Sequence, residues 1–395
     1  MTLPKENQKF LPYGKQNVSN QDIDEVISVL KSDFLTQGPT VKLFEEGISK
    51  KVNSKYSVAS NSATSSLHLA CMALGLGKDD LLWTTPITFV ASANCALYCG
   101  ANVDFVDINQ MTGLIDINLL EKKLRHAERI NKLPKILIPV HFAGSSCDMK
   151  SIFDLSKKYN FSIIEDASHA IGGKYFEYNV GSCKYSQITI FSFHPVKIIT
   201  TGEGGVATTN SRELATSMSE LRSHGITKDY DKFVEKYPKC SWRYEQQKLG
   251  FNYRLTDISA SLGLSQLKKL DNFVKERNLI FKNYQKHLKN SGLKMLSIPE
   301  GVKSALHLAV LRFERIDLQK ELYSKLRDAL IGTQVHYLPV HLQPYYKNNF
   351  GFKEGDYPES EKFSKTCLSL PLYPGLSFEE QDRVIKKILK IVSEY

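Results

Sequence analysis

Short apolar runs alternate with helical patterns between residue 56 and about residue 221. Between the runs, apolar residues recur at helical spacing, as at Ile152, Leu155 and Tyr159. This alternation predicts βα units around a largely parallel sheet. The runs, each typical of a buried strand, span residues 56–59, 81–84, 102–106, 136–140, 161–164 and 188–191, with a further strand at 206–209.

The pattern changes after residue 225. Residues 225–254 are polar and aromatic without a clear period, which indicates a long loop, and such loops are usually functional or disordered. From Asp257 toward Leu288 we expect one long amphipathic helix that bridges to a second domain. That domain is predicted to contain a strand-like segment 307–313, a helix 318–330, a returning segment 333–338 and a closing helix 378–392.

This order of elements predicts an α/β fold with a large domain and a smaller C-terminal α/β domain. We expect an N-terminal arm at residues 1–19, the large domain at 20–270 and the small domain at 271–395. With 395 residues, of which 42% are hydrophobic and 24% charged, the chain can bury a sizeable core.

The net charge of +10 raises the question of a nucleic-acid partner. The lysines are scattered, without a long basic run interleaved with aromatics, so we expect no nucleic acid to bind. A solvated, lysine-rich surface accounts for the charge. A positive rim would also help to steer a nucleotide diphosphate into a cleft.

Several kinds of site and location are not expected from the sequence. Residues 1–8 show no secretory signal, and no apolar run is long enough to cross a bilayer, so we expect no membrane partner. The seven cysteines are odd in number and lack Cys-x-x-Cys spacing, and Cys95 and Cys99 sit one helical turn apart like core residues. We therefore expect a reduced, cytoplasmic protein. His336 and His341 lack acidic or cysteine partners, so no metal is expected.

Polar residues follow the predicted strands at the carboxyl ends, where open α/β sheets bind ligands. After the strand at 56–59, the run Asn-Ser-Ala-Thr-Ser-Ser at 61–66 opens a helix and offers N–H groups and hydroxyls to an anion. The same residues would also serve as an ordinary helix cap. After the strand at 161–164 come Glu165 and Asp166, and an acidic residue there is usually a cap or a surface charge.

The third strand end, after residues 188–191, has the richest chemistry. Ser192 is followed by a turn through His194 and Pro195 to Lys197, and then by Gly-Glu-Gly-Gly at 202–205. A lysine in such a loop is normally solvated. Combined with the anion site and Asp166, however, Lys197 completes the set that pyridoxal phosphate needs: a phosphate cradle, a carboxylate for the ring nitrogen and an amine for the aldehyde. We therefore predict Lys197 and Asp166 as catalytic residues, with Lys197 also as a proton shuttle.

Two segments resemble a known family. Glu-Asp-Ala-Ser-His-Ala at 165–170, and Ser-Phe-His-Pro-Val-Lys at 192–197 with the glycine-rich 202–205, resemble the sugar aminotransferases of fold type I, the DegT/StrS type. The resemblance covers nearly the whole chain and implies pyridoxal 5′-phosphate as cofactor. It also implies Lys197 as the Schiff-base lysine, Asp166 as partner of the pyridine nitrogen and His169 as a neighbour of the ring hydroxyl.

The resemblance implies further cofactor contacts. Ala63, Thr64 and Ser192 match residues that bind the phosphate. Phe89, which could otherwise be a core aromatic, matches the side chain that stacks on the ring. Asn252, in isolation a polar turn residue, matches one that is supplied across a homodimer interface, so we expect shared active sites.

One branch of the family is more similar than the rest. His194, together with the runs 12–15, 32–39 and 334–337, resembles the aminotransferases of pseudaminic-acid biosynthesis. That resemblance implies L-glutamate as donor and carbon 4 of UDP-2-acetamido-2,6-dideoxy-β-L-arabino-hex-4-ulose, a UDP-4-keto-6-deoxy-N-acetylhexosamine, as acceptor. An isomeric UDP- or dTDP-4-keto-6-deoxy sugar is the alternative. The implied substrate contacts are Tyr13, Asp33, Phe34, Leu35, Thr36, Gln334, Val335, His336 and Tyr337.

Three other classes of function are disfavoured. Related dehydratases carry histidine in place of the cofactor lysine, whereas this chain has Lys197. A cofactor-free sugar-binding or regulatory protein would be expected to lose Lys197 or Asp166, and both are present. A nucleic-acid binder is suggested by charge alone and would show steeply salt-dependent binding without a chromophore.

Overall fold

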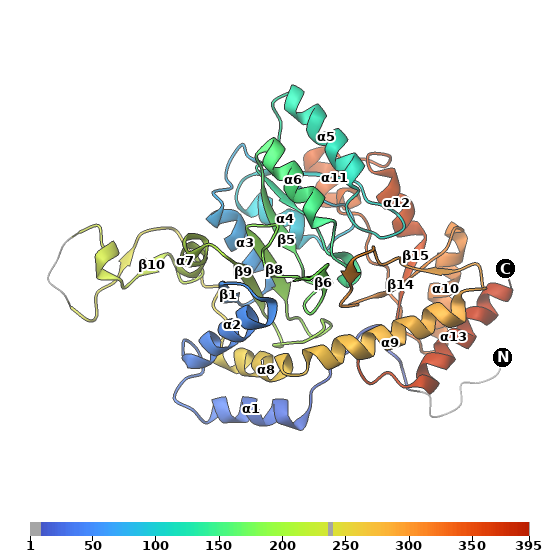
Figure 1. Cartoon of the computed structure of the whole chain (residues 1–395). Coiled ribbons are helices and arrows are strands. Elements are labelled where there is room, and N and C mark those ends of the chain that lie inside the picture. The colour runs from blue at the N-terminus through green and yellow to red at the C-terminus, as the bar shows by residue number, and fades with distance from the viewer. Residues whose placement is uncertain (1–8, 236–239, 395) are drawn as a thin grey trace.

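A seven-stranded sheet forms the centre of the chain (Figure 1). The computed structural model describes residues 9–235 and 240–394. Neighbouring strands are parallel except that β9 is antiparallel to both β1 and β8. The seven strands predicted between residues 56 and 209 all lie in this sheet, and its mostly parallel character is confirmed. Across the sheet the order is β1 (Tyr56–Ser60), β9 (Gly205–Thr209), β8 (Ile188–Ser192), β5 (Ser162–Asp166), β4 (Ile136–Ile138), β2 (Leu81–Thr84) and β3 (Asn102–Phe105).

Helices cover both faces of the sheet because successive strand residues point to opposite sides. Leu82 belongs to a core cluster that includes residues of α3, α4 and α7, whereas Trp83 belongs to a second cluster that includes residues of α5 and α6. Most of these helices begin at a side-chain cap, such as Ser62 before α3 and Asp116 before α5. Their bounds are α3 (Ala63–Ala73), α4 (Ala91–Tyr98), α5 (Ile117–Arg129), α6 (Met149–Tyr159) and α7 (Arg212–Leu221), with the short 3-10 helix η1 (Phe142–Gly144).

The expected single helix from Asp257 to Leu288 is wrong, because the structure has two helices there. α8 (Asp257–Leu267) ends at Lys268, and α9 (Leu270–Leu288) starts after Lys269. α8 is packed against α1 (Asn20–Leu30) and α2 (Pro39–Val52), while α9 extends below the C-terminal region (Figure 1). Contacts with two helices bury α8 on more than one side, whereas a single amphipathic face was expected. No helix of the described residues is long and apolar enough to cross a membrane.

The C-terminal region has its own small antiparallel sheet, in the order β12 (Lys294–Met295), β14 (Ala309–Arg312) and β15 (Cys367–Leu370). α10 (Ile316–Asp328) and the closing helix α13 (Phe378–Ser393) pack against each other, and Ser377 and Glu380 form a capping box at the start of α13. The predicted returning segment 333–338 forms one β-bridge, between Gln334 and Ser369. Between these elements lie η3 (Val340–Leu342), α11 (Pro344–Phe350) and α12 (Pro358–Lys365).

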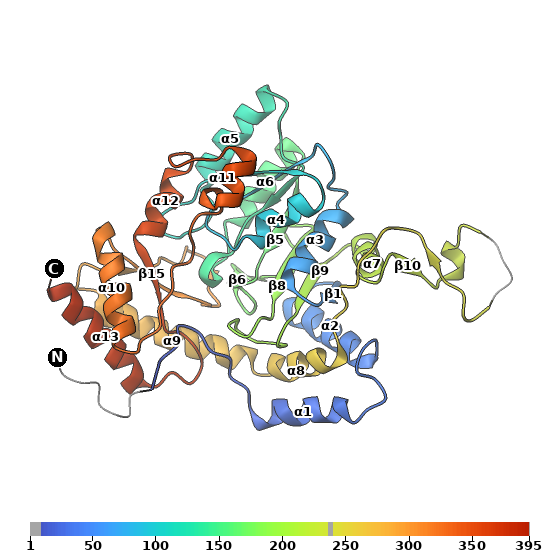
Figure 2. The same cartoon turned by 180° about the vertical axis from the view of Figure 1, so that it is seen from behind.

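A long loop was predicted for residues 225–254. Its described residues after β10 (Ile226–Thr227) and before β11 (Glu245–Gln246) form an arm that projects from the body of the molecule, as both views show (Figures 1 and 2). At its base β10 pairs with β11, followed outward by η2 (Tyr230–Lys232). A further small sheet joins β13 (Val302–Lys303), β6 (Lys174–Tyr175) and β7 (Tyr178–Asn179). The predicted domain boundaries remain a prediction.

Candidate active site

A cavity of about 580 Å³ lies at the carboxyl ends of β1, β5 and β8. Residues from the start of α3, the ends of β5 and β8, and the segment 334–337 line it together. The structure therefore brings together most residues that the sequence singled out. In its wall are Tyr13, Ala63, Thr64, Phe89, Asp166, His169, Ser192, Lys197, Gln334, Val335, His336 and Tyr337.

Lys197 lies in the turn after β8, which places its side chain in the cavity wall. The turn is closed by backbone hydrogen bonds from Lys197 to His194 and from Thr201 to Phe193, of 2.9 and 3.0 Å. Among the described residues, Lys197 is the one lysine that lines the cavity. Burial of its ammonium lowers its pKa to about 8, although the negative charge of Asp166 acts in the opposite direction. About a tenth of the amine is therefore neutral and nucleophilic at pH 7, far more than for a solvated lysine.

Asp166 is buried at the end of β5 and held by two neighbours, one of which is itself held by Thr88. Ser92 donates its hydroxyl hydrogen to Oδ2 at 2.5 Å, and the backbone N–H of Ser168 donates to Oδ1 at 3.1 Å. The hydroxyl of Thr88 lies 2.8 Å from that of Ser92. These bonds fix the carboxylate in one orientation toward the cavity. Ser92 was not identified from the sequence, although it lies only three residues after Phe89, because no local pattern shows that its hydroxyl meets the end of β5.

Glu165, the other acidic residue of this strand end, is not in the cavity wall. Strand alternation turns its side chain to the opposite face of the sheet, where Oε2 lies 2.7 Å from Nε2 of His141. Thr189 donates to its Oε1 at 3.0 Å. Glu165 is thus part of a buried hydrogen-bonded pair, and Asp166 alone faces the site.

Two neutral histidines stand beside Lys197. Burial, and then the positive charge of Lys197, hold the pKa of His169 well below its ordinary value. The hydroxyl of Tyr337 lies 3.3 Å from Nε2 of His169. His307 lines the cavity with its ring 4.3 Å from that of His169, and burial lowers its pKa as well. Sequence reasoning missed His307, because it precedes β14 in the C-terminal region and follows none of the strands of the central sheet.

Both histidines leave a buried nitrogen for a further partner. Nδ1 of His169 and Nδ1 of His307 have no hydrogen-bond partner within residues 9–235 and 240–394. Unpaired buried polar atoms are costly and rare in native proteins. Because the cavity lies beside them, these atoms fit a bound polar group such as a cofactor.

The start of α3 combines a helix cap with an anion site. The side chain of Ser62 accepts the backbone N–H of Ser65 at 3.1 Å, which is the cap expected from the sequence. The next residues, Ala63 and Thr64, line the cavity at the positive end of the helix dipole. Gly205 makes this approach possible, because a Cβ there would lie 2.4 Å from the backbone nitrogen of Ala63. The two interpretations of this segment are therefore compatible.

Phe89 and the N-terminal segment complete the wall. Phe89 is 60% exposed at the cavity, so it is not a core aromatic. Tyr13 stands with its ring 5.3 Å from that of His336, and its carbonyl accepts the N–H of Leu372 at 3.0 Å. The N-terminal segment is thereby tied to the C-terminal region over the cavity.

Asn252 and the turn 33–36 do not line the cavity of their own chain. Asn252 is exposed and forms a β-bridge with Ser223. Asp33, Phe34, Leu35 and Thr36 are also exposed. The turn is held against the start of α8, because Thr36 bridges to Thr256 and the carbonyl of Leu35 accepts the N–H of Asp257 at 3.0 Å. Both Asn252 and the turn therefore lie outside the cavity of their own chain.

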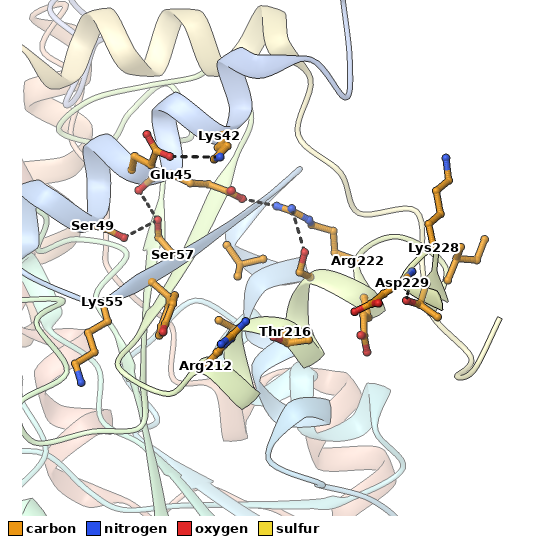
Figure 3. A pocket seen from close by; sticks show the side chains of 18 of the residues that line it. Lys42, Glu45, Ser49, Lys55, Ser57, Arg212, Thr216, Arg222, Lys228 and Asp229 are labelled. Carbon is orange, nitrogen blue, oxygen red and sulfur yellow. Dashed lines mark hydrogen bonds and ion pairs between the residues drawn. The ribbon is translucent and has the colours of Figure 1, made fainter. Parts of the chain in front are cut away.

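A larger hollow of about 670 Å³ lies elsewhere, between α2, β1, α7 and the base of the arm (Figure 3). There Arg222 pairs with Glu45 at 2.6 Å, and both bond the backbone of Ala59. These contacts close the edge of β1. None of the predicted site residues lines this hollow, so its size does not make it the active site.

The two histidines considered for metal binding have separate partners. Nδ1 of His336 lies 2.8 Å from the hydroxyl of Ser369, and Nε2 of His341 lies 3.0 Å from Oε1 of Glu361. Across residues 9–235 and 240–394, no group of three or more metal-ligating side chains is arranged to hold an ion.

The carboxyl ends of this α/β sheet carry a nucleophilic lysine, a fixed carboxylate and a helix N-terminus that can bind an anion. Together these groups define a pyridoxal-phosphate enzyme. The chain belongs to the DegT/DnrJ/EryC1/StrS aminotransferase family, whose model matches residues 16–389. It is a pyridoxal-phosphate-dependent sugar aminotransferase.

Relatives and solved structures agree with this assignment. A UDP-4-amino-4,6-dideoxy-N-acetyl-β-L-altrosamine transaminase of Campylobacter jejuni is 39% identical over 98% of both chains. The structure of PseC from Helicobacter pylori, an aminotransferase involved in the biosynthesis of pseudoaminic acid, matches with a TM-score of 0.89 and 32% identity over 98% of this chain and 100% of that one. A putative sugar aminotransferase from Streptococcus pneumoniae, solved in its PLP form, matches with a TM-score of 0.87 and 30% identity over 98% of this chain and 99% of that one.

Proposed function

We propose that this chain transfers the amino group of L-glutamate to carbon 4 of UDP-2-acetamido-2,6-dideoxy-β-L-arabino-hex-4-ulose, a step of pseudaminic-acid biosynthesis. The observation that carries the proposal is the cavity wall in which Lys197 faces Tyr13 and the segment 334–337. These are the positions that resemble the pseudaminic-acid branch. The name of the Campylobacter relative, a transaminase of a 4-amino UDP-sugar, supports the same product.

Seven free cysteines support a reducing, cytoplasmic location.

Lys197 has two roles in this proposal. Its Nζ would hold pyridoxal phosphate through the aldehyde, which the lowered pKa favours because it leaves part of the amine neutral. When the donor amine is bound instead, the freed Nζ would be the base that accepts and returns a proton beside the donor Cα. Pyridoxal phosphate supplies the electron sink when it is bound.

The neighbouring side chains orient the cofactor. Asp166, held by Ser92, keeps a proton on the ring nitrogen, and a fixed carboxylate does this without reorganisation. His169 stays uncharged beside the ring hydroxyl, because its pKa is low. Phe89, which is exposed in the cavity wall, would cover the ring of the bound cofactor. The phosphate would be held at the start of α3 and the end of β8, by N–H groups and hydroxyls of Ala63, Thr64 and Ser192.

The active unit in this proposal is a homodimer with shared sites. Asn252 and the turn 33–36 are candidate site residues that are exposed and lie outside their own cavity. A twofold axis would bring these exposed residues of each chain to the cavity of its partner. Asn252 would then contact the cofactor phosphate, and the turn 33–36 would contact the sugar.

The sugar end of the cavity is formed by Tyr13 and residues Gln334 to Tyr337, which come from the two extremes of the chain. A 4-keto sugar must present its carbonyl to the aminated cofactor, while the remote nucleotide supplies binding energy that positions it. The net charge of +10 favours approach of the UDP diphosphate. A bare hexose, which lacks that binding energy, should react poorly.

The test is a panel of UDP- and dTDP-linked 4-keto-6-deoxy sugars with glutamate, followed by mass spectrometry and NMR of the products. We expect kcat/KM for the β-L-arabino UDP sugar to exceed that for its carbon-5 epimer at least about tenfold, equivalent to about 1.4 kcal/mol. A preference for the D-xylo epimer or for a dTDP sugar would support the alternative, a carbon-4 aminotransferase of an isomeric nucleotide sugar.

A further inference from the structure

Arg277 is a fully buried arginine of α9 that does not line the cavity. Its side chain is 1% exposed, and Nη1 donates to the carbonyl of Leu372 at 3.0 Å and to that of His307 at 3.3 Å. The carbonyl of Leu306 lies 3.5 Å from the same nitrogen. A single guanidinium thus joins two segments that are far apart in the sequence.

Both segments that Arg277 joins bring a side chain to the cavity. His307 lines the cavity itself. Leu372 donates its backbone N–H to the carbonyl of Tyr13 at 3.0 Å, and Tyr13 lines the cavity from the N-terminal segment. Arg277 is therefore bonded directly to the backbone of His307 and, through one intervening residue, to that of Tyr13.

The turn before His307 has a strained backbone. Leu306 has a φ of 52°, in the left-handed region that residues other than glycine rarely adopt. Such a conformation persists only where the surrounding contacts fix it. Leu306 is buried in the core of the C-terminal region, and its carbonyl faces Arg277 together with that of His307. Arg277 therefore contacts the turn at the point where the backbone needs support to keep His307 at the cavity.

Stability alone does not account for a charged side chain at position 277. Among the described residues, Nε and Nη2 of Arg277 have no hydrogen-bond partner, and no carboxylate forms an ion pair with the guanidinium. Burial lowers its pKa to about 10, so the group is a cation at neutral pH. A buried cation without an anionic partner is destabilising. A charged donor, however, bonds a carbonyl more strongly than a neutral one, which suits a role in holding a backbone in place.

A neighbour on α9 holds one of the same segments without this double contact. The hydroxyl of Tyr284 donates to the carbonyl of Pro371 at 3.0 Å, and Tyr284 is as deeply buried as Arg277. Pro371 does not line the cavity. Tyr284 is therefore the matched control for Arg277, because it lies on the same helix and bonds neither Leu372 nor His307.

We propose that Arg277 is a positioning residue of the active site, which fixes His307 directly and Tyr13 through Leu372 so that both side chains face the bound ligand. Nδ1 of His307 is buried beside the cavity without a partner in residues 9–235 and 240–394, so a shift of its backbone would change a contact with that ligand. The role rests on the proposed function only in the choice of sugar for the kinetic test.

The first test follows the ring of His307 by NMR and needs no turnover. In holoenzyme with labelled histidine, His307→Gln identifies the ring signal of His307 by its loss. We expect Arg277→Met, which is similar in size but has no donors, to shift that signal, whereas the signal of exposed His126 on α5 should stay in place. Tyr284→Phe should move neither signal. A His307 signal that does not move in Arg277→Met overturns the proposal.

The second test is a double-variant cycle on kcat/KM for the UDP sugar. Arg277→Met should lower kcat/KM at least about tenfold, and Tyr284→Phe less than about threefold. In the His307→Gln background the loss caused by Arg277→Met should be at least about threefold smaller, because a positioning residue has less effect once its target is gone. Arg277→Lys keeps a charge and three donors, so its kcat/KM should lie between those of wild type and Arg277→Met.

Full multiplication of the two losses in the cycle overturns the proposal, since Arg277 would then act independently of His307. If Arg277→Met does not fold, Arg277→Lys goes through both tests with the same criteria. A wild-type enzyme that does not accept the UDP sugar would contradict the proposed function, whereas the NMR comparison would still decide the role of Arg277.

Discussion

Lys197 differs from a surface lysine in its environment, since its amine is desolvated in the cavity wall and feels the charge of Asp166. We therefore predict that borohydride fixes the cofactor on Lys197 and that peptide mapping finds the label there. Lys197→Ala should remove turnover, because loss of the proton transfer alone is worth about 10² to 10⁴-fold. A label on any other lysine would disprove the assignment.

The lowered pKa of Lys197 predicts a pH dependence of cofactor attachment. The neutral amine forms above its pKa, so the rate at which cofactor-free protein takes up pyridoxal phosphate should rise through about pH 8 and then level off. Asp166→Asn removes the charge that raises this pKa, so the midpoint should move to lower pH. Absorbance followed after mixing measures both midpoints. A midpoint near the ordinary lysine pKa of about 10.4 would contradict the burial of the amine.

Asp166 and Ser92 should act on the rate more than on the fold. We expect Asp166→Asn to bind cofactor but to lose on the order of 10²-fold in kcat, because the ring nitrogen loses its proton. Ser92→Ala removes one hydrogen bond to the charged carboxylate and should cost about tenfold, equivalent to about 1.4 kcal/mol. Single-turnover kinetics at saturating cofactor measure both. Equal rates for wild type and Asp166→Asn would show that the electron sink does not depend on this carboxylate.

At the scale of elements, the contact between β9 and α3 shapes the phosphate end of the cavity. Gly205→Ala would place a Cβ 2.4 Å from the backbone nitrogen of Ala63, so strand and helix must separate. We expect a loss of about 1–3 kcal/mol in the free energy of unfolding in urea, together with weaker retention of the cofactor. Gly77→Ala is the matched control, since a Cβ there meets no atom within 4 Å. Equal stability of the two variants would contradict this prediction.

The elements of the sheet were predictable, whereas the division between α8 and α9 was not. Each strand is a short apolar run with its own boundaries, so local pattern suffices to find it. Lys268 and Lys269, at which the helix breaks, are ordinary helix-forming residues. The burial of α8 comes from contacts with α1 and α2, which lie more than 200 residues earlier in the chain. A periodic helical pattern predicts a helix with one buried face. Here packing against segments that are distant in the sequence buries α8 on more than one side, which the pattern does not predict.

At the scale of the whole molecule, the proposed dimer makes a prediction about mixtures. Lys197→Ala chains lack the reactive amine, whereas Asn252→Ala chains lack the contact proposed to reach the partner. Each variant alone should be nearly inactive, and a mixture that exchanges subunits should regain one working site per heterodimer. Activity after mixing, with exchange verified by native mass spectrometry, is the measurement. Exchange without recovery would place Asn252 in the site of its own chain.

The sequence by itself determined the class of fold and the reactive groups, because strands and their carboxyl ends are local features and parallel strands present those ends at one edge. Lys197, Asp166 and the start of α3 each follow a strand, and the structure places all three in one cavity. Tertiary structure alone decided that Asp166 faces the cavity while Glu165 faces His141. The structure also showed that Ser92 and His307 belong to the site. Both come from other elements, and a local sequence pattern does not show which side chains from distant segments are in contact.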